Sequence, residues 1–270
     1  MQKYNSLLGS FILSCALFVF AQMFGVFEFA NGVNVAGIAF LLLAFFILHA
    51  MREFGEVCPL HTLLLFLIFI LLEFFGFPME ILTPFAFLAA PFYYYGMDGK
   101  GWKECAKKVG LVFERGSGAG FEGGRGTGIF ANGKITAIVM RGVIGALGLF
   151  AIAFFVSLSL YLLGISDQQN VYEKMLEFPP YLLLLAVTLS PLAEEIFFRG
   201  FLRREIGAVF SSAIFASLHF FYGSIAEIAA AFFLGWWLCV VYERSRGVYA
   251  PVIAHIIFNL ATVIYVVYFL

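Results

Sequence analysis

Long runs of apolar residues recur along the chain, with few polar residues between them. Runs of about 17 residues or more can cross a lipid bilayer as helices, and nine are present: 7–27, 33–51, 59–76, 79–95, 136–163, 180–200, 205–221, 225–242 and 249–269. Two pairs have very short connections, so eight crossings also fit. Single open strands would leave backbone groups unpaired in lipid. The pattern predicts an all-α, polytopic integral membrane bundle of eight or nine transmembrane helices.

Composition supports a membrane environment. The 270 residues are 63% hydrophobic and 12% charged, and the mean hydropathy is +0.98. Soluble domains are about 45–50% apolar and about 25% charged. The net charge of −1 gives no reason to expect a nucleic-acid partner. The four cysteines are scattered without a CxxC pair, which argues against a disulfide framework or a thiolate metal site.

The distribution of positive charge predicts the orientation and the division of the chain. If the N-terminus lies inside, all of the 16 Lys and Arg except Lys174 fall at the inner face. We therefore expect N-terminal membrane helices (1–95), a cytosolic basic and glycine-rich loop (96–134) and a membrane core (135–270). The expected location is the cell membrane, or the endoplasmic reticulum in a eukaryote.

Ionisable residues cost about 2.5–3.5 kcal/mol each near the bilayer centre, yet AEEIFFRG (193–200) follows one of the most apolar runs. Glu195 and Arg199 are four residues apart, so they face one another on a helix. Glu194 is rotated by about 100° from Glu195 and lacks a local partner. A dry site disfavours its charged form, which suits a general base. The spacing predicts a bracing role for Glu195 with Arg199 and a chemical role for Glu194.

Two later helices carry further polar residues, in FASLH (215–219) and HIIFN (255–259). His255 and Asn259 are four residues apart and share a helical face. Arg203 and Arg246 should mark the inner surface, and Glu194 and His255 each lie nine residues from one of them. Both would therefore be about 13 Å deep.

The depth of His219 depends on where its helix begins. A start near Ser211 gives about 12 Å, whereas a start at Arg204 gives about 22 Å, which is too deep to join the others. Gly207 and the pair of serines at 211–212 favour the shallower position. We expect Glu194, His219 and His255 to converge on one cavity, with Asn259 beside them.

These groups indicate hydrolysis. Glu194 can polarise a water with assistance from His219, while His255 and Asn259 can donate hydrogen bonds to an oxyanion. Glu194, His219 and His255 also have the donor types of a His₂Glu site for Zn²⁺. No HExxH is present, and the residues alone leave both mechanisms open.

The three motifs EEIFFR (194–199), FASLH and HIIFN resemble, in order, the EExxxR, FxxxH and HxxxN motifs of the CAAX-processing and bacteriocin-processing membrane endopeptidases, often called CPBP or Abi. The resemblance covers about 180–262. It implies an intramembrane endopeptidase with its site open to the cytosol, in which Glu194 is the catalytic glutamate, His219 its partner, and His255 with Asn259 the oxyanion pair. The family has been described both as metalloproteases and as metal-independent glutamate proteases. Its eukaryotic members remove the last three residues from prenylated CAAX proteins, so the implied substrate is a prenylated or other membrane-anchored protein.

Two other classes of function remain open. Paired polar groups at mid-depth also mark the paths of ion or solute transporters, although no inverted repeat is evident. A non-catalytic membrane immunity or assembly factor would keep the same helices without turnover. The physiological substrate, the metal dependence and the oligomeric state are not encoded in any recognisable motif.

Overall fold

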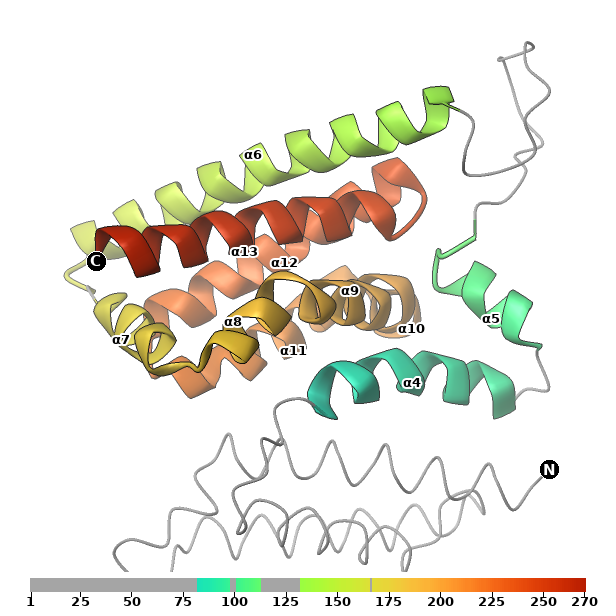
Figure 1. Cartoon of the computed structure of the whole chain (residues 1–270), viewed down its shortest axis with the longest axis horizontal. Helices are drawn as coiled ribbons and strands as arrows, with labels where there is room; N and C mark the ends of the chain where they lie inside the picture. The colour runs from blue at the N-terminus through green and yellow to red at the C-terminus, as the bar shows by residue number, and fades with distance from the viewer. Residues whose placement is uncertain (1–81, 98–100, 113–131, 166) are drawn as a thin grey trace, which may run out of the picture. The chain divides into compact units, whose positions relative to one another are not determined.

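The computed structural model describes residues 82–97, 101–112, 132–165 and 167–270 (Figure 1). Within these ranges every regular element is a helix, as the sequence predicts, and none is a strand. The chain divides into two compact units after residue 100. The described residues of the first unit form α4 (Leu82–Met97), which overlaps the predicted run 79–95. The predicted runs 7–27, 33–51 and 59–76 lie outside the described residues, so the total of eight or nine crossings stays a prediction.

The described residues of the second unit form eleven helical elements. In chain order they are α5 (Trp102–Lys108), α6 (Asn132–Leu162), α7 (Gln169–Glu177), α8 (Pro180–Val187), α9 (Leu189–Glu194), the π-helix η4 (Glu195–Leu202), α10 (Arg203–Ile206), α11 (Ala208–Ser217), the 3₁₀-helix η5 (Leu218–Tyr222), α12 (Ile225–Ser245) and α13 (Tyr249–Phe269).

Three described helices are long and apolar enough to cross a membrane: Ile135–Leu162, Ile225–Ser245 and Tyr249–Phe269. They correspond to the predicted runs 136–163, 225–242 and 249–269. A fourth candidate is the bent pair Pro180–Val187 and Leu189–Ile206, which covers the predicted run 180–200 with a bend of 40°. Several such helices are what a multi-pass membrane protein requires.

The predicted run 205–221 does not form one continuous membrane helix. Gly207 has φ +87°, which ends α10, and α11 then has only ten residues before the chain tightens into η5. The segment nevertheless runs along most of α12. Arg203 bonds to Glu243 near the end of α12, and Ser224, which follows η5, caps its beginning. The start of α11 at Ala208 puts His219 about 17 Å along this segment, between the two depths considered above.

Small residues allow α6 to approach α12 and α13 closely. A Cβ added to Gly142 would lie 2.6 Å from the Ile253 side chain, and one added to Gly148 would lie 2.4 Å from Trp237. Trp237 also donates a hydrogen bond to the Gly145 carbonyl at 2.9 Å. Ala146, four residues after Gly142, is buried as well, so the two form a small-xxx-small pair at this helix contact.

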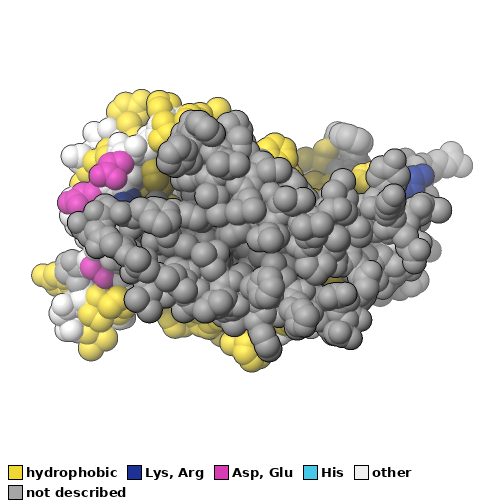
Figure 2. Space-filling model, turned by 90° about the horizontal axis from the view of Figure 1, so that it is seen from below, with side chains coloured by type: hydrophobic (Ala, Val, Ile, Leu, Met, Phe, Trp, Pro, Cys, Tyr) yellow, Lys and Arg dark blue, Asp and Glu magenta, His cyan; other side chains and the backbone are white. Residues whose placement is uncertain are grey.

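The outward face of α6 is hydrophobic. Leu147, Phe154 and Tyr161 are each more than 60% exposed, an exposure that suits contact with lipid rather than water. Figure 2 shows the described part of one face of the molecule, where hydrophobic side chains predominate and acidic side chains gather at one end.

Candidate functional site

Pro191 sets the break between α8 and α9. Proline has no N–H and its ring clashes with the carbonyl four residues earlier, here that of Val187. The helix accordingly ends at Val187, and Thr188 has φ −125° and ψ −83°. The break leaves the Ala186 carbonyl without its helical partner, and Nδ2 of Asn259 donates to that oxygen at 2.8 Å. Asn259 therefore ties α13 to the break.

A π-helix presents the two glutamates. Glu194 is the last residue of α9, and Glu195 is the first residue of η4. Turns of π-helix are rare and frequently lie at functional sites. The side chain of Glu194 is 23% exposed, whereas that of Glu195 is 0% exposed. The two neighbours thus have different surroundings, as the sequence predicts.

The predicted ion pair of Glu195 and Arg199 is present and fully buried. Nη1 of Arg199 lies 3.0 Å from Oε1 of Glu195. This distance makes an ion pair, but the two groups are not aligned for a hydrogen bond. The guanidinium carbon lies 4.4 Å from the centroid of the Phe215 ring, and Nη2 donates to the Gly235 carbonyl at 3.4 Å. Arg199 therefore joins η4 to α11 and α12 as well as neutralising Glu195.

His255 connects the two glutamates, which the sequence does not reveal. Its Nδ1 lies 2.8 Å from Oε1 of Glu195, and its Nε2 lies 3.9 Å from Oε2 of Glu194. A carboxylate can only accept, so Nδ1 carries the hydrogen and donates it to Glu195. The ring is thereby held with Nε2 toward Glu194. Glu195, predicted only as the partner of Arg199, also orients His255.

His219 lies near this group, against the ring of Phe215. Its Nδ1 is 2.9 Å from the Phe215 carbonyl, and because that oxygen accepts, Nδ1 donates. The Phe215 ring centroid is 4.7 Å from that of His219 and 6.2 Å from that of His255. His219 and His255 lie within electrostatic reach of one another. The Phe215 ring therefore neighbours both imidazoles.

A third carboxylate, that of Glu227, lies near this site, although no motif in the sequence predicts a chemical role for it. Glu227 lies within electrostatic reach of His219 and of the Tyr222 hydroxyl. Its backbone N–H bonds to the Ser224 hydroxyl at 3.0 Å, which caps α12. The S-x-x-E spacing at 224–227 is visible in the sequence but signals only a helix start. The sequence pattern therefore places Glu227 in the first turn of a helix but does not reveal that it lies near His219.

The expected Zn²⁺ ligands do not fit a metal site. Glu194, His219 and His255 all lie in the described part of the chain, where no group of three or more His, Cys, Asp or Glu side chains is arranged to hold a metal ion. Both imidazoles use Nδ1 for a hydrogen bond, His255 to Glu195 and His219 to the Phe215 carbonyl.

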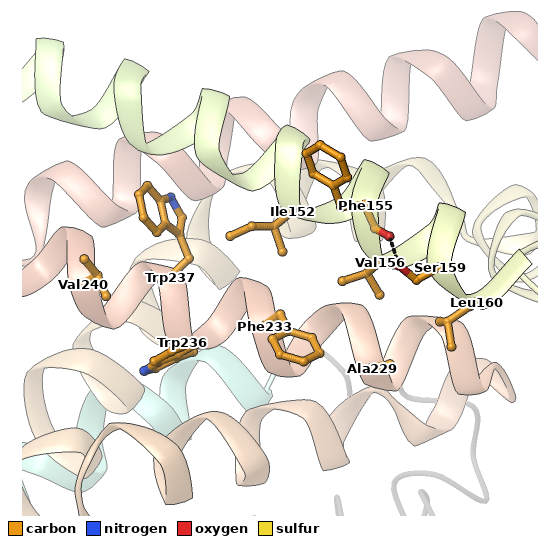
Figure 3. Close-up of a pocket in the computed structure, with 10 residues that line it drawn as sticks. All are labelled: Ile152, Phe155, Val156, Ser159, Leu160, Ala229, Phe233, Trp236, Trp237 and Val240. Atoms are coloured by element: carbon orange, nitrogen blue, oxygen red, sulfur yellow. Dashed lines mark hydrogen bonds between the residues drawn. The ribbon is translucent and has the colours of Figure 1, made fainter. Parts of the chain in front are cut away.

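A cavity of about 630 Å³ lies elsewhere, between α6 and α12 (Figure 3). Phe155, Phe233, Trp236 and Trp237 contribute to its lining, which contains no ionisable side chain. Gly235 and Trp237 are two positions apart on α12: Gly235 accepts from Arg199, whereas Trp237 faces α6. The cavity and the polar cluster therefore lie against different faces of α12.

Comparisons with known proteins agree with the motifs. Residues 176–261 match the family described as type II CAAX prenyl endopeptidase Rce1-like. A curated protein of Bacillus subtilis (strain 168), described as uncharacterized protein YpbD, is 36% identical over 85 residues, which are 30% of this chain. The matched part spans 42% of the length of that relative. No solved structure matches.

The matched segment contains both glutamates, Arg199, both histidines and Asn259. The resemblance deduced from three short motifs over about 180–262 is confirmed over nearly the same residues. Over residues 176–261, this chain is therefore similar to the Rce1-like type II CAAX prenyl endopeptidase family.

Proposed function

We propose that this protein is an intramembrane endopeptidase that cleaves near the C-terminus of prenylated or other membrane-anchored proteins, with its site open to the cytosol. The observation that carries the proposal is the position of His255 between the two glutamates. One imidazole nitrogen is fixed by Glu195 at 2.8 Å, and the other faces Glu194 at 3.9 Å. A family match over 176–261 supports the same class of reaction.

A water molecule placed between Glu194 and His255 would be the nucleophile. The 3.9 Å separation of Oε2 and Nε2 is too long for a direct hydrogen bond. A water beside both atoms can bond to each of them. Glu194 takes a proton from this water, and the oxygen of the water forms a bond to the scissile carbonyl carbon. Glu194 is the more exposed of the two glutamates, which suits the residue that meets the substrate.

The second half of the reaction returns that proton. The tetrahedral intermediate collapses, the C–N bond breaks, and the leaving amine nitrogen takes the proton from Glu194. Hydrogen-bond donors beside the site stabilise the oxyanion. Asn259 remains a candidate donor, because its amide nitrogen carries two N–H groups and the bond to Ala186 uses one. Arg199 and Glu195 keep His255 in place throughout.

The test is cleavage of a prenylated CAAX peptide by the purified full-length protein in detergent. Release of the terminal tripeptide is expected with the wild type, and it should persist with a chelator because no metal set is formed by Glu194, His219 and His255. Cleavage that stops with chelator and returns with Zn²⁺ would contradict the water mechanism. A wild-type protein that folds but releases no peptide from prenylated or unprenylated substrates would favour the transporter or assembly-factor alternatives.

A further inference from the structure

A short turn outside the family segment contacts both helices that carry the site. It consists of Val109, Gly110 and Leu111, directly after α5, and we call it the 109–111 turn. Val109 has no exposed surface. The turn lies at the end of the bundle where α10 ends and α13 begins (Figure 1).

The first contact is with the π-helix. A Cβ added to Gly200 would lie 2.4 Å from the Val109 carbonyl oxygen, which is closer than real Cβ atoms approach. Gly200 is buried and directly follows Arg199. Only glycine therefore lets the backbone of the turn rest on η4 at this point.

The second contact is with the start of α13. The Val248 N–H donates to the Gly110 carbonyl at 3.3 Å, and the Tyr249 hydroxyl donates to the Leu111 carbonyl at 2.8 Å. Gly110 has φ +81°, and a Cβ there would meet the Tyr242 hydroxyl at 2.6 Å. Six residues beyond Tyr249, about 9 Å along the helix, lies His255.

We propose that the 109–111 turn is a positioning element for the site: it fixes the cytosolic end of η4 relative to the start of α13, and so sets the approach of Glu194 and Glu195 to His255. The turn touches neither substrate nor reacting atoms. It acts through Gly200 on one side and Val248 and Tyr249 on the other. The expected effect of the turn on turnover rests on the proposed function, whereas its expected effect on the relative position of η4 and α13 does not.

The test uses full-length variants in detergent. Gly200→Ala fills the space that the Val109 carbonyl occupies, and Tyr249→Phe removes one bond without changing the ring. The controls are Gly101→Ala, where an added Cβ meets nothing within 4 Å, and Tyr161→Phe, at an exposed residue. The readouts are amide hydrogen exchange of 195–202 and 249–255, and the pH–rate profile with a prenylated CAAX peptide.

We expect faster exchange in both segments for Gly200→Ala and Tyr249→Phe, with kcat reduced about tenfold to a hundredfold and the acid limb of the pH profile displaced. A lower rate with an unchanged pH profile would reduce the turn to a structural support and overturn the proposal. So would exchange equal to that of the controls. If Gly200→Ala does not fold, the hydrogen exchange and pH–rate profile of Tyr249→Phe decide whether the turn is a positioning element. If the wild type does not cleave the peptide, the proposed function fails, and hydrogen exchange alone decides whether the turn fixes the two helices.

Discussion

Nδ1 of His255 lies 2.8 Å from Oε1 of Glu195, a buried carboxylate sixty residues earlier in the chain. The same oxygen is 3.0 Å from Arg199 Nη1. Glu195 thus serves a cation on its own helix and an imidazole on α13, so its loss affects both.

Removal of Glu195 should destabilise the fold strongly. Breaking one partner of a buried ion pair typically costs about 3–5 kcal/mol, because the other charge is left unpaired. We expect Glu195→Ala and Arg199→Ala to reduce the yield of folded protein and its melting temperature in detergent. The matched control is Glu243→Ala, which breaks the Arg203–Glu243 pair at a glutamate 57% exposed. Exposed pairs are worth about 0–1 kcal/mol. Equal losses for Glu195→Ala and Glu243→Ala would refute the bracing role.

Glu194→Gln should separate chemistry from stability. Glutamine keeps the shape of the side chain but cannot act as a general base, which contributes about 10²–10⁴ in rate. We expect an unchanged melting temperature and a loss of peptide cleavage of that size. The control is Glu173→Gln, an exposed position on α7. Near-normal turnover in folded Glu194→Gln would remove Glu194 from the mechanism.

Asn259→Ala should lower stability whether or not the amide also binds an oxyanion. The substitution leaves the Ala186 carbonyl without its donor at the α8 break. An unsatisfied buried carbonyl costs about 1–3 kcal/mol, and because this bond is part-buried we expect a loss near the lower end. Thr262→Ala, one turn away, removes only a bond to the carbonyl of its own helix and is the control. Thermal melting in detergent distinguishes them, and identical melting curves would show that the break does not depend on Asn259.

Asp167 should make stability sensitive to acid. Burial raises the pKa of Asp167, but bonds from the Ser224 hydroxyl and the Ile225 and Ala226 N–H groups outweigh it and hold the pKa below its ordinary value of 3.8. Because the folded value is lowered, the stabilisation is present above pH 3.8 and is lost as the pH falls through the folded value.

The corresponding measurement is the melting temperature of the wild type and Asp167→Asn across pH. The wild type should be the more stable at neutral pH, and the difference should remain steady down to about pH 5 and shrink below about pH 4. A difference that persists undiminished in strong acid would show that the charge of Asp167 does not contribute. These bonds hold the turn before α7 to the beginning of α12.

The ion pair of Glu195 and Arg199 could be predicted from the sequence, whereas the contact of Glu195 with His255 and the partner of Asn259 could not. Glu195 and Arg199 are four positions apart, so helical geometry alone pairs them. The contact of Glu195 with His255 joins residues sixty positions apart and depends on how α13 packs. Pro191 signals a helix break, but nothing in the sequence identifies Asn259 as the donor at that break. Hydrophobic runs predicted four of the described membrane elements, whereas Gly207 and η5 divide the run 205–221, because hydropathy does not register backbone conformation.

The π-helix implies a constraint on chain length as well as on residue identity. A single π-turn contains one more residue than the α-turn that it replaces. Deleting one residue from η4, even an apolar one such as Phe197, would let this turn return to regular α-helix and leave Glu194 in nearly the same orientation relative to α10. The spacing of Glu195 and Arg199 would instead fall from four residues to three, so one member of the buried pair would leave its present contacts. Single-residue deletions between Glu195 and Arg199 should therefore be less tolerated than apolar substitutions at the same positions.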